Sequence, residues 1–145
     1  MNPMLHALLQ AKKALIKGEI PIGAVIVKNN KIIARGYNQT ESKKNIFAHA
    51  EIIALKKAAK KTGDWRLSGC EIYVTLQPCL MCIGALYQSR ISKVYFGAYD
   101  KTSNINWLKI HSLNHKFKVY KGGIKEKECS SILKEFFKNK RKNKM

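Results

Sequence analysis

The sequence predicts an α/β protein with a three-layer α-β-α arrangement, in which helices cover both faces of a five-stranded mixed sheet. Segments rich in β-branched residues alternate with segments of helical periodicity along the chain, which is typical of layered folds. The first two strand-like segments are separated only by Lys28-Asn29-Asn30, and this spacing predicts an antiparallel hairpin. With 145 residues, 46% of them hydrophobic, the chain suffices for one buried core, so we expect a single domain over residues 1–145.

The individual elements follow from local patterns. Apolar residues at helical spacing run up to Gly18 and, in a second segment, up to Gly63, and glycine commonly ends a helix. A third helix starts just after Pro78, a common helix-starting context. In chain order the pattern predicts helix 4–17, strands 20–27 and 31–37, helix 48–61, strand 70–76, helix 79–88, strands 93–97 and 117–120, and a closing helix from 125 to about 140.

The charge balance is strongly basic. The chain has 28 Lys plus Arg against 9 Asp plus Glu, and its net charge of +19 would attract polyanions such as nucleic acid. Because 24 of the 28 are Lys and the chain is also rich in Ile and Asn, an AT-rich coding sequence would produce the same excess. The basic C-terminal helix and tail, about residues 125–145, either contacts phosphates or is a solvated, frayed end. Its last dozen residues carry Lys134, Lys138, Lys140, Arg141, Lys142 and Lys144.

The cysteines and the N-terminal segment bear on the cellular compartment. Of four cysteines only Cys79 and Cys82 lie close together, which favours a metal or catalytic pair in a reducing cytoplasm over a disulfide framework. The apolar N-terminal segment is interrupted early by His6 and Gln10, so it fits neither a signal sequence nor a membrane-spanning helix. We therefore expect a cytoplasmic protein with no membrane segment.

Two predicted helix starts carry the reactive side chains. His49-Ala50-Glu51 opens one helix, and Pro78-Cys79-Leu80-Met81-Cys82 opens the other. One imidazole and two thiolates, from His49, Cys79 and Cys82, suit Zn²⁺, and three protein ligands leave the fourth tetrahedral position to water, as in catalytic zinc sites. Helix N-termini also favour the thiolate form of cysteine. We therefore expect one Zn²⁺ per chain, with water or hydroxide as its fourth ligand.

Glu51 stands two residues from a predicted zinc ligand, where a carboxylate can move protons. Replacing the exocyclic amine of a base by oxygen requires attack of hydroxide on a ring carbon, a proton on the ring nitrogen and another on the departing amine. One carboxylate can take and deliver these protons, so Glu51 is the predicted catalytic residue. A structural zinc site would instead need a fourth protein ligand, such as Cys70, Cys129 or His115, and would leave Glu51 without a task.

The H-x-E and P-C-x-x-C combination matches the signature of zinc-dependent nucleobase deaminases. Over nearly its full length the chain resembles the bacterial tRNA adenosine deaminases, a branch of the cytidine and deoxycytidylate deaminase superfamily. The resemblance implies a cytidine deaminase-like fold, a homodimer, and hydrolytic deamination of adenosine to inosine at the wobble position of a tRNA anticodon, expected in an arginine tRNA. It runs through residues 18–24, 48–51, 75–82 and 97–100, and continues at 113–115, 123–124, 128–129, 136–137 and 141.

By this resemblance, five further residues would contact the tRNA anticodon stem-loop. Asn38 would hydrogen-bond the flipped adenine, and Asp100 and Asn114 would contact nucleotides near it. Phe137 and Arg141 would hold the anticodon loop, since stacking on an aromatic ring is the usual way to bind an unpaired base. Two of them also have a structural interpretation: Asn38 could serve the turn after its strand, and Asp100 could cap the following segment.

The sequence departs from the family pattern in two places, and two other functions stay open. Gln77 stands where the family usually has Glu, which removes a negative charge near the zinc, and the loop after Asp100 is shortened to residues 101–104. A deaminase of a free base, nucleoside or nucleotide, such as cytosine, guanine or deoxycytidylate, would share the zinc site. A non-catalytic RNA-binding protein with a structural zinc would share the basic charge.

Overall fold

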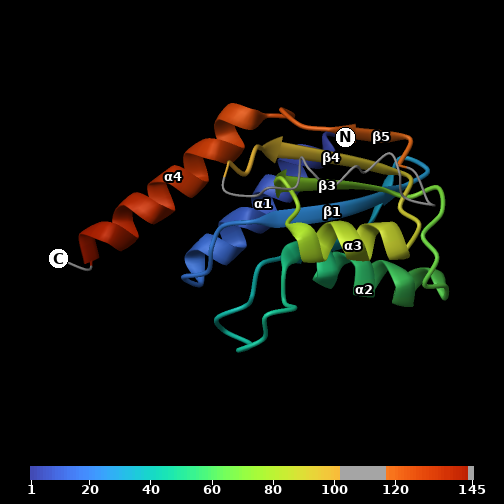
Figure 1. Cartoon of the computed structure of the whole chain (residues 1–145), viewed down its shortest axis with the longest axis horizontal. Coiled ribbons are helices and arrows are strands. Elements are labelled where there is room, and N and C mark those ends of the chain that lie inside the picture. The colour runs from blue at the N-terminus through green and yellow to red at the C-terminus, as the bar shows by residue number, and fades with distance from the viewer. Residues whose placement is uncertain (102–116, 144–145) are drawn as a thin grey trace.

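The computed structural model describes residues 1–101 and 117–143 and contains a sheet flanked by helices (Figure 1). In chain order the elements are α1 (Pro3–Ile16), β1 (Gly23–Lys28), β2 (Lys31–Tyr37), α2 (Ala50–Thr62), β3 (Glu71–Leu76), α3 (Leu80–Gln88), β4 (Lys93–Ala98), β5 (Val119–Lys121) and α4 (Glu126–Asn143). The strands lie in the order β2-β1-β3-β4-β5. Within the described ranges, no helix is both long enough and apolar enough to cross a membrane.

Helices cover both faces of the sheet, which confirms the predicted three-layer arrangement. On one face α2 and α3 pack through a core in which Ala54 and Leu86 meet Ile72 of β3. On the other face α1 and α4 share a second core that contains Met4 and Leu133. Successive side chains of a strand point to opposite faces, so the same strands supply both cores.

The predicted starts of β1, α2 and β5 are each two or three residues too early, and the errors at β1 and α2, which border the site, have a local cause. β1 begins at Gly23 rather than at residue 20, because the N–H of Ile22 bonds to the carbonyl of Ile20 at 2.8 Å in a tight turn. α2 begins at Ala50 rather than at residue 48, because His49 keeps an extended backbone and takes the N-cap position. The second shift places His49 at the very start of its helix.

The strand directions bring four strand ends to one edge of the sheet. Because β1 runs antiparallel to both β2 and β3, its start lies beside the ends of its two neighbours: Gly23 pairs with Tyr37, and Ala24 with Val74. The end of β4 lies at the same edge because β4 runs parallel to β3. Ligands of α/β proteins commonly bind at the carboxyl ends of parallel strands, so a site is expected here.

The start of α2 lies in very close contact with the sheet. At Gly36 of β2, a Cβ atom would overlap the carbonyl oxygen of Ala50 and lie 2.9 Å from the nitrogen of Ala54. Strand and helix can approach this closely only because residue 36 has no side chain. The first turn of α2, directly after His49, is thereby held against the sheet.

Candidate active site

Two helix N-termini face each other near the edge where the strand ends meet. His49 and Cys79 occupy the N-cap positions of α2 and α3, both with an extended backbone. Neither side chain makes the hydrogen bond that an N-cap residue usually makes to its own helix, so both can point into the space between the helices. Cys82 follows in the first turn of α3 and is fully buried. The two helices thus present all three predicted zinc ligands to one place.

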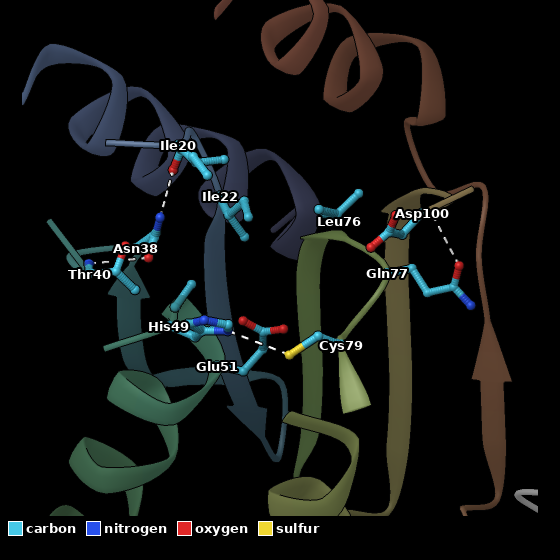
Figure 2. A pocket seen from close by; sticks show the side chains of 11 residues that line it. Ile20, Ile22, Asn38, Thr40, His49, Glu51, Leu76, Gln77, Cys79 and Asp100 are labelled. Carbon is cyan, nitrogen blue, oxygen red and sulfur yellow. Dashed lines mark hydrogen bonds between the residues drawn. The ribbon is translucent and has the colours of Figure 1, made fainter. Parts of the chain in front are cut away.

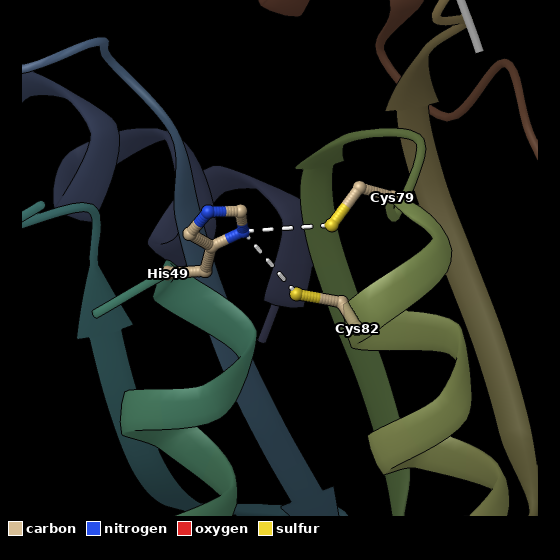
Figure 3. A group of neighbouring side chains, drawn as sticks. All are labelled: His49, Cys79 and Cys82. Atoms are coloured by element: carbon tan, nitrogen blue, oxygen red, sulfur yellow. Dashed lines mark hydrogen bonds between the residues drawn. The ribbon is translucent and has the colours of Figure 1, made fainter. Parts of the chain in front are cut away.

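These three side chains form a compact group (Figure 3). Nδ1 of His49 lies 3.6 Å from Sγ of Cys79 and 3.5 Å from Sγ of Cys82. The three candidate ligand atoms all lie within 4.8 Å of one another. A tetrahedral zinc ion with bonds of about 2.0–2.3 Å holds its nitrogen and sulfur ligands roughly 3.6 Å apart. Donor types and spacing therefore fit a zinc ion, with His49 presenting Nδ1 to it.

The members of this group shift one another's protonation. The hydrogen bond with Cys82, reinforced by His49, lowers the pKa of the Cys79 thiol to about 4 despite burial. The same hydrogen bond and burial raise the pKa of Cys82, and hydrogen bonding to Cys79 raises the pKa of His49. The group therefore contains a thiolate at neutral pH, and a bound cation would favour a second one.

A cavity of about 210 Å³ opens beside the group, at the edge where the strand ends meet (Figure 2). It combines apolar walls with a few polar side chains, as small-molecule sites usually do. The wall residues Ile20, Ile22, Thr40 and Leu76 could not be assigned to the site from the sequence, because their side chains carry no reactive group. The full lining is Ile20, Ile22, Asn38, Thr40, His49, Ala50, Glu51, Leu76, Gln77, Cys79 and Asp100.

Glu51 projects into the middle of this cavity. Figure 2 shows its carboxylate between His49 and Cys79, although only 4% of the residue is exposed. Burial raises the pKa of Glu51 to about 7, and the neighbouring Cys79 sulfur acts in the same direction. A carboxyl group that titrates near neutrality can both accept and donate a proton, which suits a base that later acts as an acid.

Asn38 follows β2 and is buried in one wall of the cavity. Its Nδ2 donates to the carbonyl of Ile20, and its Oδ1 accepts the N–H of Thr40, both at 3.4 Å. The structural role considered for Asn38 is therefore present, because the second bond serves the turn after the strand. Both bonds are long, and the side chain also lines the cavity.

A buried carboxylate that was not among the predicted site residues holds the loop beyond Thr40. Glu19 is 1% exposed, and its Oε1 and Oε2 accept the N–H groups of Glu41 at 3.0 Å and Ser42 at 2.7 Å. Burial alone would raise the pKa of Glu19, but these hydrogen bonds outweigh it and keep the pKa below 4.5. In the sequence, Glu19 is an acidic residue between a helix-ending glycine and an apolar segment, within the stretch 18–24 that resembles the family.

Asp100 lies two residues after the end of β4 and lines the cavity on the side opposite Asn38 (Figure 2). Its backbone N–H donates to Oε1 of Gln77 at 3.1 Å. The structure therefore brings Asn38, Glu51 and Asp100 to one cavity with His49, although they come from different segments of the chain.

The remaining predicted RNA contacts do not line the cavity. Phe137 and Arg141 are exposed on α4, which projects away from the sheet (Figure 1). Phe136 is less exposed than Phe137, and the two rings meet edge to face with their centroids 5.3 Å apart. Asn114 and residues 102–104 of the shortened loop lie outside the described residues.

Among the described residues, no fourth side chain joins the candidate metal group. Cys70 precedes β3, whereas Cys79 follows the end of that strand. Cys129 is buried on α4, where its Sγ would clash with a Cβ at Gly97. His115 lies outside the described residues. Three ligands beside an open cavity are the arrangement of a catalytic rather than a closed structural zinc site.

Known proteins similar to this chain first place it in a broad class. A family model described as MafB19-like deaminase matches residues 2–141, so the chain is a deaminase-class protein. The chain has the parts that this class requires, namely a His-Cys-Cys group and a buried carboxylate that lines the adjoining cavity.

More similar relatives then give the family. The tRNA-specific adenosine deaminase of Bacillus subtilis (strain 168) is 45% identical over 146 residues, covering 97% of this chain and 90% of that protein. The tRNA-specific adenosine deaminase of Aquifex aeolicus (strain VF5) is 46% identical over 142 residues, covering 94% and 93%. A solved structure from studies of A-to-I editing by tRNA:A34 deaminases superimposes with a TM-score of 0.83 at 38% identity, covering 90% of this chain and 98% of that one. The chain belongs to the family of the tRNA-specific adenosine deaminases, which confirms the resemblance and the cytidine deaminase-like fold.

Proposed function

We propose that this protein converts adenosine to inosine by hydrolysis at the wobble position of a tRNA anticodon, in an arginine tRNA. The observation that carries the chemistry is the group of His49, Cys79 and Cys82, with Glu51 buried beside it in the same cavity. The choice of substrate is supported by relatives named tRNA-specific adenosine deaminases, which match nearly the whole chain.

His49, Cys79 and Cys82 are the proposed ligands of one Zn²⁺. A zinc ion held there supplies a Lewis acid that lowers the pKa of a water molecule to about 7. The positive ends of the α2 and α3 helix dipoles point to the same place and stabilise the thiolates.

Glu51 is proposed to move the protons of the reaction. It takes one proton from the attacking water and delivers it to the ring nitrogen of the base. It then takes a second proton from the hydroxyl group now on the ring carbon and delivers it to the amine, which leaves as ammonia. Because the pKa of Glu51 is about 7, its carboxylate and carboxylic acid forms are both accessible at neutral pH.

The cavity has room for a base but not for an anticodon loop, so the reacting adenosine must leave its stack to enter. We propose that Asn38 hydrogen-bonds the flipped adenine and that Asp100 and Asn114 contact neighbouring nucleotides. On α4, exposed Phe137 and Arg141 would hold the loop outside the cavity by stacking and by pairing with phosphate.

Turnover on RNA tests the proposal. Zinc-loaded protein is incubated with an unmodified arginine tRNA carrying adenosine at the wobble position, and inosine is read by sequencing. We expect inosine with the natural chain and none with Glu51→Ala, and absence of inosine with zinc-loaded protein contradicts the proposal.

Ammonia release from cytosine, guanine or deoxycytidylate, without release from tRNA, would instead support a free-base or nucleotide deaminase. A Glu51→Ala variant that behaves like the natural chain in every assay would support a non-catalytic RNA-binding protein.

We also infer that the protein forms a homodimer whose subunit boundary lies beside the cavity. We infer further that it works in a reducing cytoplasm. Large apolar side chains are exposed next to the zinc ligands: Phe47 is 58% exposed two residues before His49, and Leu80 is 59% exposed directly after Cys79. The four cysteines are all free thiols, which fits reducing surroundings. Light scattering during size-exclusion chromatography should give twice the chain mass, and a monomer mass at assay concentration would contradict the dimer.

A further inference from the structure

Gln77 is the residue at which this chain departs from the expected family pattern, and it occupies a junction of three strands. It directly follows β3 and stands two residues before Cys79. Only 7% of it is exposed, and it lines the cavity. Its backbone N–H donates to the carbonyl of Ala98 at 2.8 Å, which ties it to the end of β4. The backbone of Gln77 is thus fixed to β4 independently of any contact that its side chain makes.

The side-chain amide of Gln77 joins two further segments. Its Oε1 accepts the backbone N–H of Asp100 at 3.1 Å, and its Nε2 donates to the phenol oxygen of Tyr120 in β5 at 3.3 Å. A backbone N–H can only donate, so the amide must turn its oxygen toward Asp100. Tyr120 is itself held by the ring of Phe96, with ring centroids 5.3 Å apart.

The two side chains of this junction point to different places. Figure 2 shows the Gln77 amide extending away from Glu51, while the Asp100 carboxylate lies on the cavity side. The amide therefore contacts the backbone of Asp100 rather than the space where a base would lie. The hydrogen bond to this backbone N–H is the contact by which the Gln77 amide can hold Asp100 at the cavity.

We infer that Gln77 is a positioning residue that holds Asp100 at the cavity and thereby sets how tightly the RNA beside the reacting adenosine is bound. The inference rests on the proposed function, in which Asp100 contacts that RNA. A neutral amide holds Asp100 without adding negative charge. The cavity already contains the carboxyl groups of Glu51 and Asp100, and a third one would further repel a polyanionic substrate.

A double-mutant cycle with an anticodon stem-loop RNA tests the inference. Gln77→Leu keeps a similar size and removes both side-chain hydrogen bonds, whereas Asp100→Ala removes the carboxylate and keeps the backbone N–H. We expect Gln77→Leu to raise KM about tenfold, the scale of one lost hydrogen bond, while kcat changes by less than about twofold. In the Asp100→Ala background it should change KM by less than about twofold, because no carboxylate is left to misplace. An equal rise of KM in both backgrounds would overturn the inference, since a general structural effect behaves that way.

Hydrogen exchange at the Asp100 amide, measured by NMR at equal zinc content, provides a second readout that needs no RNA. Exchange should be faster in Gln77→Leu and close to that of the natural chain in Gln77→Glu, whose carboxylate can accept the same N–H while Tyr120 donates to it. Unchanged exchange in Gln77→Leu would overturn the inference. If the natural chain makes no inosine, the proposed function fails, whereas the exchange rates still decide whether Gln77 holds Asp100.

Discussion

Replacing Gly36 by alanine should lower the activity by displacing the start of α2 from the sheet. Gly36 lies in β2 and lines no part of the cavity. A methyl group at this position would overlap the carbonyl oxygen of Ala50, which stands between the proposed zinc ligand His49 and the proposed proton-transferring residue Glu51. The substitution therefore acts on both residues through the helix that carries them.

The magnitude follows from the contact distances. The new Cβ would lie 2.9 Å from the nitrogen of Ala54, tighter than ordinary van der Waals contact, and closer still to Ala50. Both contacts are backbone atoms that cannot turn aside, so α2 must move outward by on the order of 1 Å. Overpacking of this kind costs about 1–3 kcal/mol of unfolding free energy, and a 1 Å misplacement of catalytic groups costs about 100-fold in rate.

The assay compares kcat/KM on the stem-loop RNA, zinc content and urea unfolding for Gly36→Ala and a matched control. Gly84→Ala is that control, because Gly84 lies in α3 close to Cys82, yet a Cβ there would meet no atom within 4 Å. We expect Gly84→Ala to keep activity and to gain about 0.5–1 kcal/mol from helix propensity. Wild-type kcat/KM for Gly36→Ala at equal zinc content would refute the reasoning.

Three further substitutions test individual side chains. Glu51→Gln should lower kcat by at least about 10²–10⁴-fold and leave zinc content and RNA affinity unchanged, as measured by single-turnover assay, metal analysis and filter binding. Cys82→Ser should lower the zinc retained after dialysis and lose activity with it, and a variant that keeps full zinc would contradict the ligand assignment. Glu19→Gln should cost about 1–3 kcal/mol at neutral pH, because one charge-assisted bond to the loop N–H of Glu41 or Ser42 is lost. The pKa of Glu19 is lowered on folding, so its stabilisation is present above pH 4.5 and is lost as the pH falls through the folded pKa. The difference in unfolding free energy between Glu19→Gln and the natural chain, measured by urea unfolding, should therefore disappear in acid. A difference that is independent of pH would contradict this account.

The elements and the reactive residues could be read from the sequence because both depend on short-range order. His49 and Glu51 are two residues apart, and Cys79 and Cys82 are three apart, so each pair falls in the first turn of one helix in any fold that forms the helix. The error at the start of β1 was also local, since Ile20 and Ile22 have strand-like side chains but lie in a turn. Periodicity describes which residues favour a strand and not where its hydrogen bonds begin.

The cavity walls could not be predicted because they depend on contacts between distant segments. The antiparallel pairing of Ala24 with Val74 places the start of β1 beside the end of β3, and no local pattern specifies it. The bonds from Glu19 to Ser42 and from Gln77 to Tyr120 join residues 23 and 43 positions apart. The proposed metal ligands and the proposed proton-transferring residue belong to short motifs. The positions of Asn38 and Asp100 around them result from the packing of the whole sheet, because only packing brings the strand ends together.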